Sequence, residues 1–252
     1  MPDNHTAATP LAGRDDGAGE PVILLAEPLP LYEPRLPEAA ELHFDAIRGA
    51  MRGRAVLRWT PQNGRYEVEL IVTPEAGSGA TLRQHSTGAI GGHGLEPQRF
   101  VDQRNGRGQR AANFRRALVP GPDGGHAGEL SFSASTERLP LPDGLQDRLG
   151  WLLQIVGVMN ARTANGQPVE EPIVLGVAGL RGGMARWTFD VQADTAADPP
   201  AWRLVREPQG PYDTRVELWL DTSPPHWPLR VRYAEASGDP LDLVRRAQSA
   251  TP

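Results

Sequence analysis

Gln146 and Asp147 carry side chains suited to orient a ligand, because they stand directly before the most apolar segment of the sequence. An amide and a carboxylate beside apolar side chains can hold the polar head group of a ligand. Trp151 and Gln154 follow within the same segment, so we name Gln146, Asp147, Trp151 and Gln154 as a candidate ligand-binding site. The alternative is structural: Gln146 completes a capping box and Asp147 complements a helix dipole.

Arginines form a second candidate site. Residues 83–116 contain seven arginines and two acidic residues, a local charge of +5. Because side chains alternate between the two faces of a strand, several of these arginines could share one face and bind phosphate head groups, acidic glycans or an envelope protein. The candidate partner-binding residues are Arg99, Arg104, Arg107, Arg110 and Arg115. The alternative is a solvated sheet face balanced by acids on adjacent strands.

The remaining polar residues match no catalytic or metal-binding motif. His85 and His93 flank a glycine-rich turn and could clip a metal, but they lack a clear third ligand. No serine stands in a G-x-S-x-G elbow, and no Lys-Ser/Thr pair follows the glycine-rich stretches. We therefore expect no catalytic residue, no metal and no cofactor, with a hydrolase kept as an alternative.

One apolar helix is predicted near 143–160. Asp143 can cap its first turn, and eight of the eleven residues in 149–159 are large and apolar. A helix of this composition must be buried. The small or polar stripe formed by Asp147, Gly150, Gln154 and Gly157 would let a strand or a ligand approach the helix backbone closely. We expect the helix to stop at Asn160.

Most of the remaining sequence predicts strands. A hairpin with its turn at 61–64 would place Ala55, Leu57 and Trp59 opposite apolar residues of the partner strand. The turn-rich stretches at 91–97, 120–128 and 163–172 are long enough to be mobile. The fold class predicted is mainly β, with a strongly curved antiparallel sheet, an open barrel or half-barrel, wrapped around one apolar helix near 143–160. The predicted strands are 41–47, 54–60, 65–73, 81–90, 98–103, 111–119, 129–135, 173–180, 185–193, 201–207, 214–221, 229–235 and 242–246.

Composition divides the chain into two parts. Residues 1–38 are rich in Pro, Ala, Gly and acids and predict a flexible tether, whose apolar island at 22–34 could dock on the body. Residues 39–248 predict a single β-rich domain. Seven acids and two arginines fall in 1–38, whereas 39–252 carries 24 residues of each sign. The neutral body argues against nucleic-acid binding.

Cysteine, signal and membrane patterns bear on the compartment. The sequence has no cysteine, which excludes disulfides and fits either the cytoplasm or an oxidising envelope compartment. The first residues lack the basic start and apolar core of a signal peptide, and no apolar run has the length of a membrane span. Membrane association is expected only through an anchor upstream of this sequence.

Four stretches together resemble the DUF3108 family of bacterial envelope proteins. They are ELHFDAIRGAMRGRAVLRWTPQNGRYEVEL, GLEPQRFVDQRNGR, LPLPDGLQDRLGWLLQIVGV and the C-terminal VELWLDTSPPHWPLRVRYAEASGDPLDLV, and they cover roughly residues 38–246. The resemblance implies a β-rich domain that is periplasmic or membrane-tethered facing the periplasm. The resemblance does not by itself imply an enzymatic activity.

Three functions follow from these patterns. The first is a non-enzymatic envelope protein that binds a lipid or other amphipathic ligand in a cleft between sheet and helix. The second is a structural or assembly module that binds an envelope partner through the arginine-rich face. The third is a hydrolase of envelope glycans or lipids, which requires two carboxylates, or a histidine and a carboxylate, to converge in a concave site.

Overall fold

The computed structural model describes residues 27–76, 81–105, 107–116, 128–211 and 213–247, which form one large sheet and one helix. The sheet has fifteen strands in the order β8-β7-β6-β5-β4-β3-β2-β1-β15-β14-β13-β12-β11-β10-β9. It is not closed, and all neighbours are antiparallel except β9 and β10. The elements are β1 (Ala40–Arg48), β2 (Met51–Gln62), β3 (Arg65–Pro74), β4 (Leu82–Gly91), β5 (Gly94–Arg104), β6 (Arg110–Arg115), β7 (Glu129–Phe132), β8 (Arg138–Pro140), β9 (Leu145–Gln146), α1 (Gly150–Ala164), β10 (Ile173–Ala178), β11 (Met184–Asp194), β12 (Ala201–Arg206), β13 (Arg215–Asp221), β14 (Pro228–Ala234) and β15 (Leu241–Arg245). The prediction of a mainly β chain with a large antiparallel sheet and one helix is confirmed for these residues.

The β2–β3 hairpin shows how local sequence produces this sheet. Asn63 and Gly64 have φ angles of 51° and 71°, the left-handed pair that a two-residue hairpin turn requires. The register then pairs Leu57 with Leu70 and Trp59 with Val68, all of them buried. The predicted hairpin and its apolar face are therefore confirmed.

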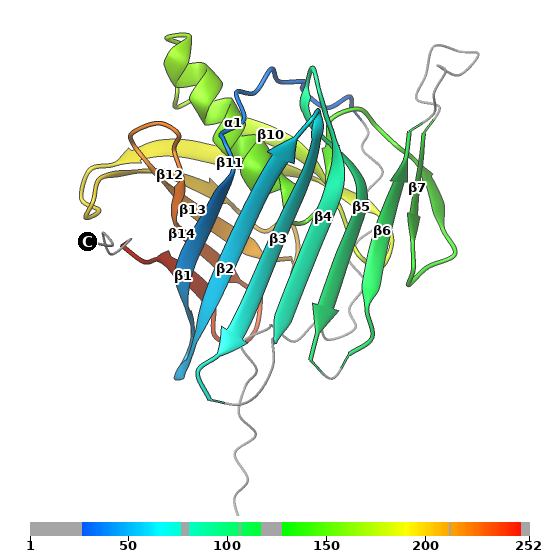
Figure 1. The fold of residues 1–252 in the computed structure, drawn as a ribbon, viewed down its shortest axis with the longest axis horizontal. Helices are drawn as coiled ribbons and strands as arrows, with labels where there is room; N and C mark the ends of the chain where they lie inside the picture. The colour runs from blue at the N-terminus through cyan, green and yellow to red at the C-terminus, as the bar shows by residue number, and fades with distance from the viewer. Residues whose placement is uncertain (1–26, 77–80, 106, 117–127, 212, 248–252) are drawn as a thin grey trace, which may run out of the picture.

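The first and last strands of the described chain lie side by side, because β1 pairs with β15. Strands β1–β8 form one half of the sheet and β9–β15 the other, and Figure 1 shows β1–β6 in front of β10–β14. One cluster of buried apolar side chains draws on both halves and on α1, with Phe44, Trp151 and Leu218 among its members. The two halves therefore share one core.

The predicted helix start at Asp143 is wrong, because the chain is not helical there. Gly144 takes a left-handed φ of 74°, and Leu145 with Gln146 then pairs in parallel with β10. The helix begins only at Gly150. A two-residue strand set by a partner some thirty residues away leaves no local sequence signal. Within the described ranges no helix is long and apolar enough to cross a membrane.

The predicted stop at Asn160 is also wrong. Asn160 lies inside α1, where it is buried and its Nδ2 donates a hydrogen bond to the Arg35 carbonyl at 3.1 Å. The helix continues to Ala164, and Gly166, with φ of 65°, supplies the left-handed residue just beyond its end.

Residues 27–39, which the composition assigns mostly to the tether, lie against α1 and β10. The Arg35 amide donates to the Gly157 carbonyl at 2.9 Å, and a Cβ added at Gly157 would lie 2.8 Å from Pro34 Cβ. Leu29 is buried against Gly176 of β10. The small stripe of α1 thus admits a segment of this chain. The division into tether and domain stays a prediction, and residues 1–26 lie outside the described ranges.

Two connections differ from the predicted turns. Strands β4 and β5 continue into the stretch 91–97 and pair as far as Gly91 and Gly94, because Gly94 adopts a φ of 95° that closes a tight turn. The stretch 163–172 includes the end of α1. Most of the turn predicted at 120–128 lies outside the described residues, and strands β8 and β9 were not predicted.

Candidate ligand-binding site

Asp147 is fully buried at the start of α1, although it is a carboxylate. Its Oδ1 accepts hydrogen bonds from the backbone amides of Leu149 at 2.8 Å and Gly150 at 2.7 Å. Its Oδ2 accepts a short hydrogen bond from the Ser86 hydroxyl of β4. Burial raises the pKa of this carboxyl more than these hydrogen bonds lower it. Asp147 therefore caps the helix and ties it to the sheet.

The two glutamines of the candidate site bind the backbone of β5 and its preceding turn. Gln154 Oε1 accepts from the Leu95 amide at 2.9 Å, and its Nε2 donates to the His93 carbonyl at 2.9 Å. Gln146 Nε2 donates to the Leu95 carbonyl at 2.9 Å. Both side chains are buried. Their amides thus attach α1 and β9 to β5, a role that the helix pattern did not reveal.

Trp151 joins an aromatic cluster with β11. Its ring stacks on Phe189 at a centroid distance of 5.3 Å and lies 5.7 Å from Trp187. The indole Nε1 of Trp151 and the Oε1 of Gln146 are buried without a hydrogen-bond partner in the described structure. The four candidate residues are therefore close together in the packed core. Their binding of a ligand stays a prediction.

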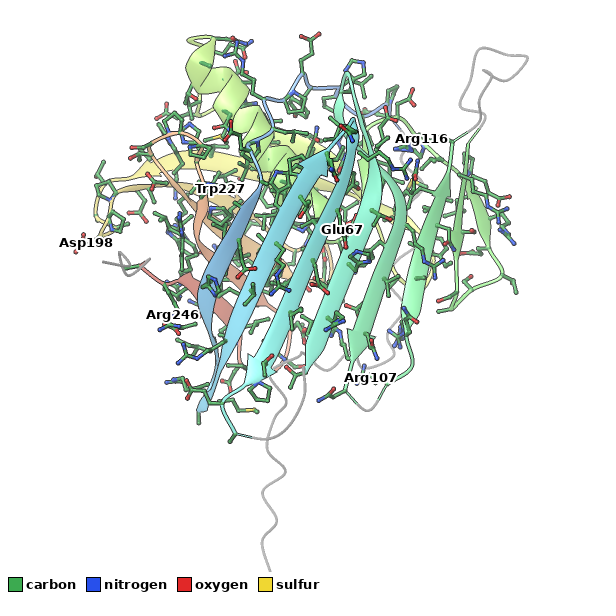
Figure 2. All side chains as sticks on the ribbon, viewed as in Figure 1. Glu67, Arg107, Arg116, Asp198, Trp227 and Arg246 are labelled. Carbon is green, nitrogen blue, oxygen red and sulfur yellow. The ribbon has the colours of Figure 1, made fainter. Side chains whose placement is uncertain are left out.

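Three of the five candidate arginines lie on the outer surface. Arg99 on β5 and Arg115 on β6 are exposed, and Arg99 donates to Asn113 Oδ1 at 2.8 Å. Arg107 lies in the turn that joins β5 to β6, at the lower edge of the sheet in Figure 2. These three residues are separated along the edge and the outer face of β5 and β6.

The other two arginines belong to the opposite face. Arg104 lines an internal pocket, and its Nε donates to Asp102 Oδ1 at 3.1 Å. Arg110 is in register with the buried Asp102. The five arginines therefore do not share one face of the sheet. Sheet pairing brings Asp102 beside Arg104 and Arg110, which the excess of positive charge in the sequence did not indicate.

Acids balance arginines on the outer face of β1–β4. Arg58 contacts Glu41 at 2.6 Å and Glu69 at 3.2 Å, and Arg83 lies 3.7 Å from the same Glu69. These contacts match the alternative of a solvated, balanced face. Partner binding through arginines stays a prediction.

The two histidines considered as possible metal ligands, His85 and His93, have different neighbours. His85 Nε2 lies 2.7 Å from Glu67 on the outer face, where Figure 2 labels Glu67. His93 Nδ1 lies 3.3 Å from the Tyr32 carbonyl. The described residues include no group of three or more His, Asp or Glu side chains placed to hold a metal.

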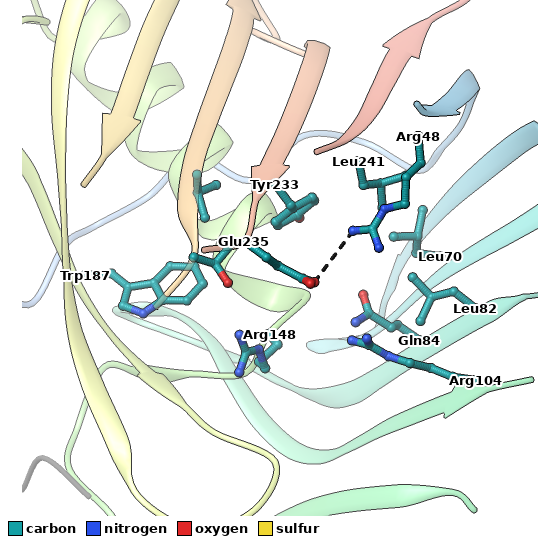
Figure 3. A pocket seen from close by; sticks show the side chains of 12 residues that line it. Arg48, Leu70, Leu82, Gln84, Arg104, Arg148, Trp187, Tyr233, Glu235 and Leu241 are labelled. Carbon is teal, nitrogen blue, oxygen red and sulfur yellow. Dashed lines mark ion pairs between the residues drawn. The ribbon is translucent and has the colours of Figure 1, made fainter. Parts of the chain in front are cut away.

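A pocket lies between the two halves of the sheet (Figure 3). The cavity volume is about 80 Å³, within about 660 Å³ of space that includes the open mouth. One wall comes from β1 and β3–β5, and the other comes from β11 and β13–β15 with residues next to these strands. Arg148, just before α1, also lines the pocket. The lining residues are Arg48, Leu70, Leu82, Gln84, Arg104, Arg148, Trp187, Thr214, Val216, Tyr233, Glu235 and Leu241.

The lining combines apolar side chains with three arginines and one carboxylate. Arg48 is 4 % exposed, and its guanidinium lies 3.6 Å from Glu235. Burial lowers the pKa of Arg48, Glu235 partly offsets this, and the charge of Arg104 lowers it further. On the opposite wall, burial raises the pKa of Tyr233, and the charge of Arg148 opposes that rise. The positive charges of Arg48, Arg104 and Arg148 are therefore all close to the same pocket.

Sequence reasoning missed this pocket, although one signal was present. Strand alternation places Arg48 on the same face of β1 as Leu42, Phe44 and Ala46, all of them buried. An arginine that continues an apolar face is unusual, because a buried cation needs a partner. The partner residue Glu235 lies 187 positions after Arg48 along the chain, so no local motif joins them.

Comparison with known proteins gives a likeness of fold. No family model and no curated protein matches the sequence. The chain is similar to the crystal structure of a beta-barrel-like protein of the domain of unknown function DUF1849 from Brucella abortus, with a TM-score of 0.52 and 11% identity over 84% of this chain and 97% of that one. At this identity the likeness supports the fold alone.

This likeness corrects the family resemblance drawn from the sequence. The solved structure belongs to DUF1849, and no family model supports DUF3108. In the structure the quoted stretches are strands β1–β3, strand β5, β9 with the first part of α1, and strands β13–β15, features that β-rich folds share without common family membership. The periplasmic location, which only the DUF3108 resemblance implied, stays a prediction.

Proposed function

We propose that the protein is a non-enzymatic binding protein that holds an amphipathic molecule, such as a lipid, in the pocket between the two halves of its sheet. In this proposal the sheet is strongly curved, a half-barrel around α1, and the pocket lies between its two halves beside the start of the helix. The observation that carries the proposal is the mixed lining, in which Leu70, Leu82 and Val216 lie beside three arginines. An apolar wall with a few convergent polar groups is typical of small-molecule sites.

The position of the pocket differs from the cleft expected beside Gln146 and Asp147. Those side chains and Trp151 fill the space along α1, whereas the pocket begins at Arg148 and Trp187. The ring centroids of Trp187 and Trp151 are 5.7 Å apart. A ligand in the pocket would therefore be separated from Trp151, the candidate residue on α1, by the ring of Trp187.

The lining favours binding over hydrolysis. Glu235 is the one carboxylate among the described residues that line the pocket, and no histidine accompanies it. Its carboxylate faces Arg48. Acid–base hydrolysis by paired carboxylates needs two such groups in reach of one bond, which this lining does not provide.

The test compares ligands that co-purify with three forms of the full chain. Native mass spectrometry and solvent extraction of the unmodified protein should reveal a bound amphipath. Thr214→Trp places a large side chain at the pocket, and we expect it to lose that molecule. Thr188→Trp is the matched control, because Thr188 is exposed on β11 outside the pocket. A molecule kept by Thr214→Trp, or absent from the unmodified protein even after incubation with lipid extract, would contradict the proposal.

A further inference from the structure

Arg48 is a buried cation whose hydrogen-bonding capacity is not used up. A guanidinium has five N–H donors. The nearest carboxylate oxygen, on Glu235, is 3.6 Å away, beyond the roughly 2.7–2.9 Å of a charge-assisted hydrogen bond. The Nε of Arg48 is buried and has no hydrogen-bond partner in the described structure. A buried donor of this kind favours an additional acceptor, and Arg48 is one of the residues that line the pocket.

The surrounding charges make that acceptor an anion. Arg104 and Arg148 line the same pocket, and Arg104 is close enough to disfavour the charge of Arg48. Asp102 accepts hydrogen bonds from both Arg104 and Gln84, which leaves its oxygens engaged away from Arg48. Two buried or half-buried cations that repel each other are stabilised when an anion enters between them.

Two carboxylates, those of Glu235 and Asp239, lie near Arg48 and partly compensate its charge. Glu235 has a side chain 31 % exposed, and Figure 3 shows its carboxylate directed at Arg48 among the lining residues. Asp239 lies against Gly49, the neighbour of Arg48, and adds a weaker favourable charge. Glu235 can turn toward water because it is partly exposed, whereas Arg48 cannot leave its buried position without opening β1.

We propose that the pocket binds the anionic head group of a small amphipath, a carboxylate or a phosphate, and that Arg48 is the residue that selects for negative charge. Glu235 is the internal counterion that the head group replaces. The apolar chain of the ligand lies along Leu82, Leu241 and Trp187. This inference rests on the proposed function and names the class of molecule that the pocket takes.

Titration calorimetry on the full chain tests the inference with three probes that share one chain length. Octanoate and octyl phosphate carry an anionic head group, and 1-octanol carries a neutral one. We expect at least one anionic probe to bind about tenfold or more tightly than the alcohol, since a charge-assisted contact to a buried guanidinium has about that effect. The stronger of the two anions identifies the head group as carboxylate or phosphate.

Four variants separate the role of Arg48 from that of net charge. Arg48→Gln should weaken anion binding about tenfold and leave octanol binding unchanged. Glu235→Gln should strengthen anion binding severalfold because it removes the competing carboxylate. The double variant R48Q/E235Q keeps the formal charge of the unmodified protein, and it should bind anions as weakly as R48Q. Arg58→Gln, on the outer face, is the control for loss of one positive charge and should have no effect.

The outcomes distinguish this inference from the proposed function. Equal binding of octanoate, octyl phosphate and octanol, unchanged in R48Q, would keep an amphipath-binding pocket and overturn the selection for anions. Binding of none of the probes, together with no co-purified molecule, would overturn both. If R48Q does not fold, Arg104→Gln takes its place with a severalfold loss expected, and unchanged affinity there would also contradict the inference.

Discussion

Asp147 has the residue type and position of a ligand-binding residue in the sequence, but in the structure its carboxylate makes structural contacts. The side chain is buried. It accepts hydrogen bonds from two backbone amides at the start of α1 and from the Ser86 hydroxyl. Ser86 in turn lies 3.1 Å from the Tyr66 hydroxyl. Burial raises the pKa of Tyr66 and the charge of Asp147 raises it further. This buried chain of polar groups links α1 to β3 and β4.

The raised pKa of Asp147 predicts a dependence of stability on pH. In the unfolded chain this carboxyl releases its proton near its usual pKa of 3.8, while in the folded protein it holds the proton to higher pH. Between the two pKa values the folded state binds more protons, so the free energy of unfolding falls as pH rises. Asp147→Asn keeps acceptor oxygen for the backbone amides and removes this titration.

Urea unfolding of the native protein and of Asp147→Asn, followed from acidic to neutral pH, measures the effect. The free energy of unfolding of the variant minus that of the native protein should increase with pH above 3.8 and become constant once the folded carboxyl is ionised. A difference that stays constant, or that decreases with pH, would contradict the raised pKa.

The two glycines of α1, Gly150 at its start and Gly157 in its interior, have different surroundings. A Cβ at Gly157 would lie 2.8 Å from Pro34 Cβ and 3.0 Å from Leu36 Cδ2, whereas at Gly150 the nearest atoms are 3.4 Å away. The segment 27–39 therefore approaches α1 most closely at Gly157. A methyl group there must displace this segment, because the helix itself is enclosed.

Gly157→Ala is expected to destabilise the protein by about 1–3 kcal/mol, the usual range for overpacking, although alanine is the better helix former. Gly150→Ala is the matched control in the same helix and should leave the stability unchanged or slightly higher. Denaturant unfolding measures both, and hydrogen exchange should show faster exchange of the Arg35 amide, which donates to Gly157, in Gly157→Ala alone. Equal stabilities of the two variants would contradict the close approach.

Sequence reasoning predicted elements better than it predicted their boundaries or contacts. Alternation and turn residues located the β2–β3 hairpin, because its turn and register depend on neighbours in the chain. The start of α1 was misplaced, because β9 forms only where Leu145 pairs with Gly176. The candidate residues at the helix start do lie together, but their partners, such as Leu95, come from a strand fifty residues earlier. Periodicity carries no information about such partners.

At the scale of the whole molecule, the pairing of β1 with β15 determines both the core and the pocket. It places the early strands opposite the late ones, so that Arg48 meets Glu235 and one apolar cluster draws on both halves. A pocket made in this way has no motif in any single segment. The same arrangement implies that neither half retains its core without the other, so the described sheet and α1 should unfold as one unit.

Replacement of Trp151 by alanine tests this shared core. Trp151 is fully buried and stacks on Phe189, so Trp151→Ala should cost about 3–5 kcal/mol of stability. If both halves unfold together, hydrogen exchange of the slowest amides in β3 and in β13 should accelerate by the same factor. Trp219→Ala is the control, since Trp219 lies on the outer face between Arg203 and Arg230, and its loss should cost less. Faster exchange confined to β10–β12 in Trp151→Ala, with β2–β4 unchanged, would show that the halves unfold separately.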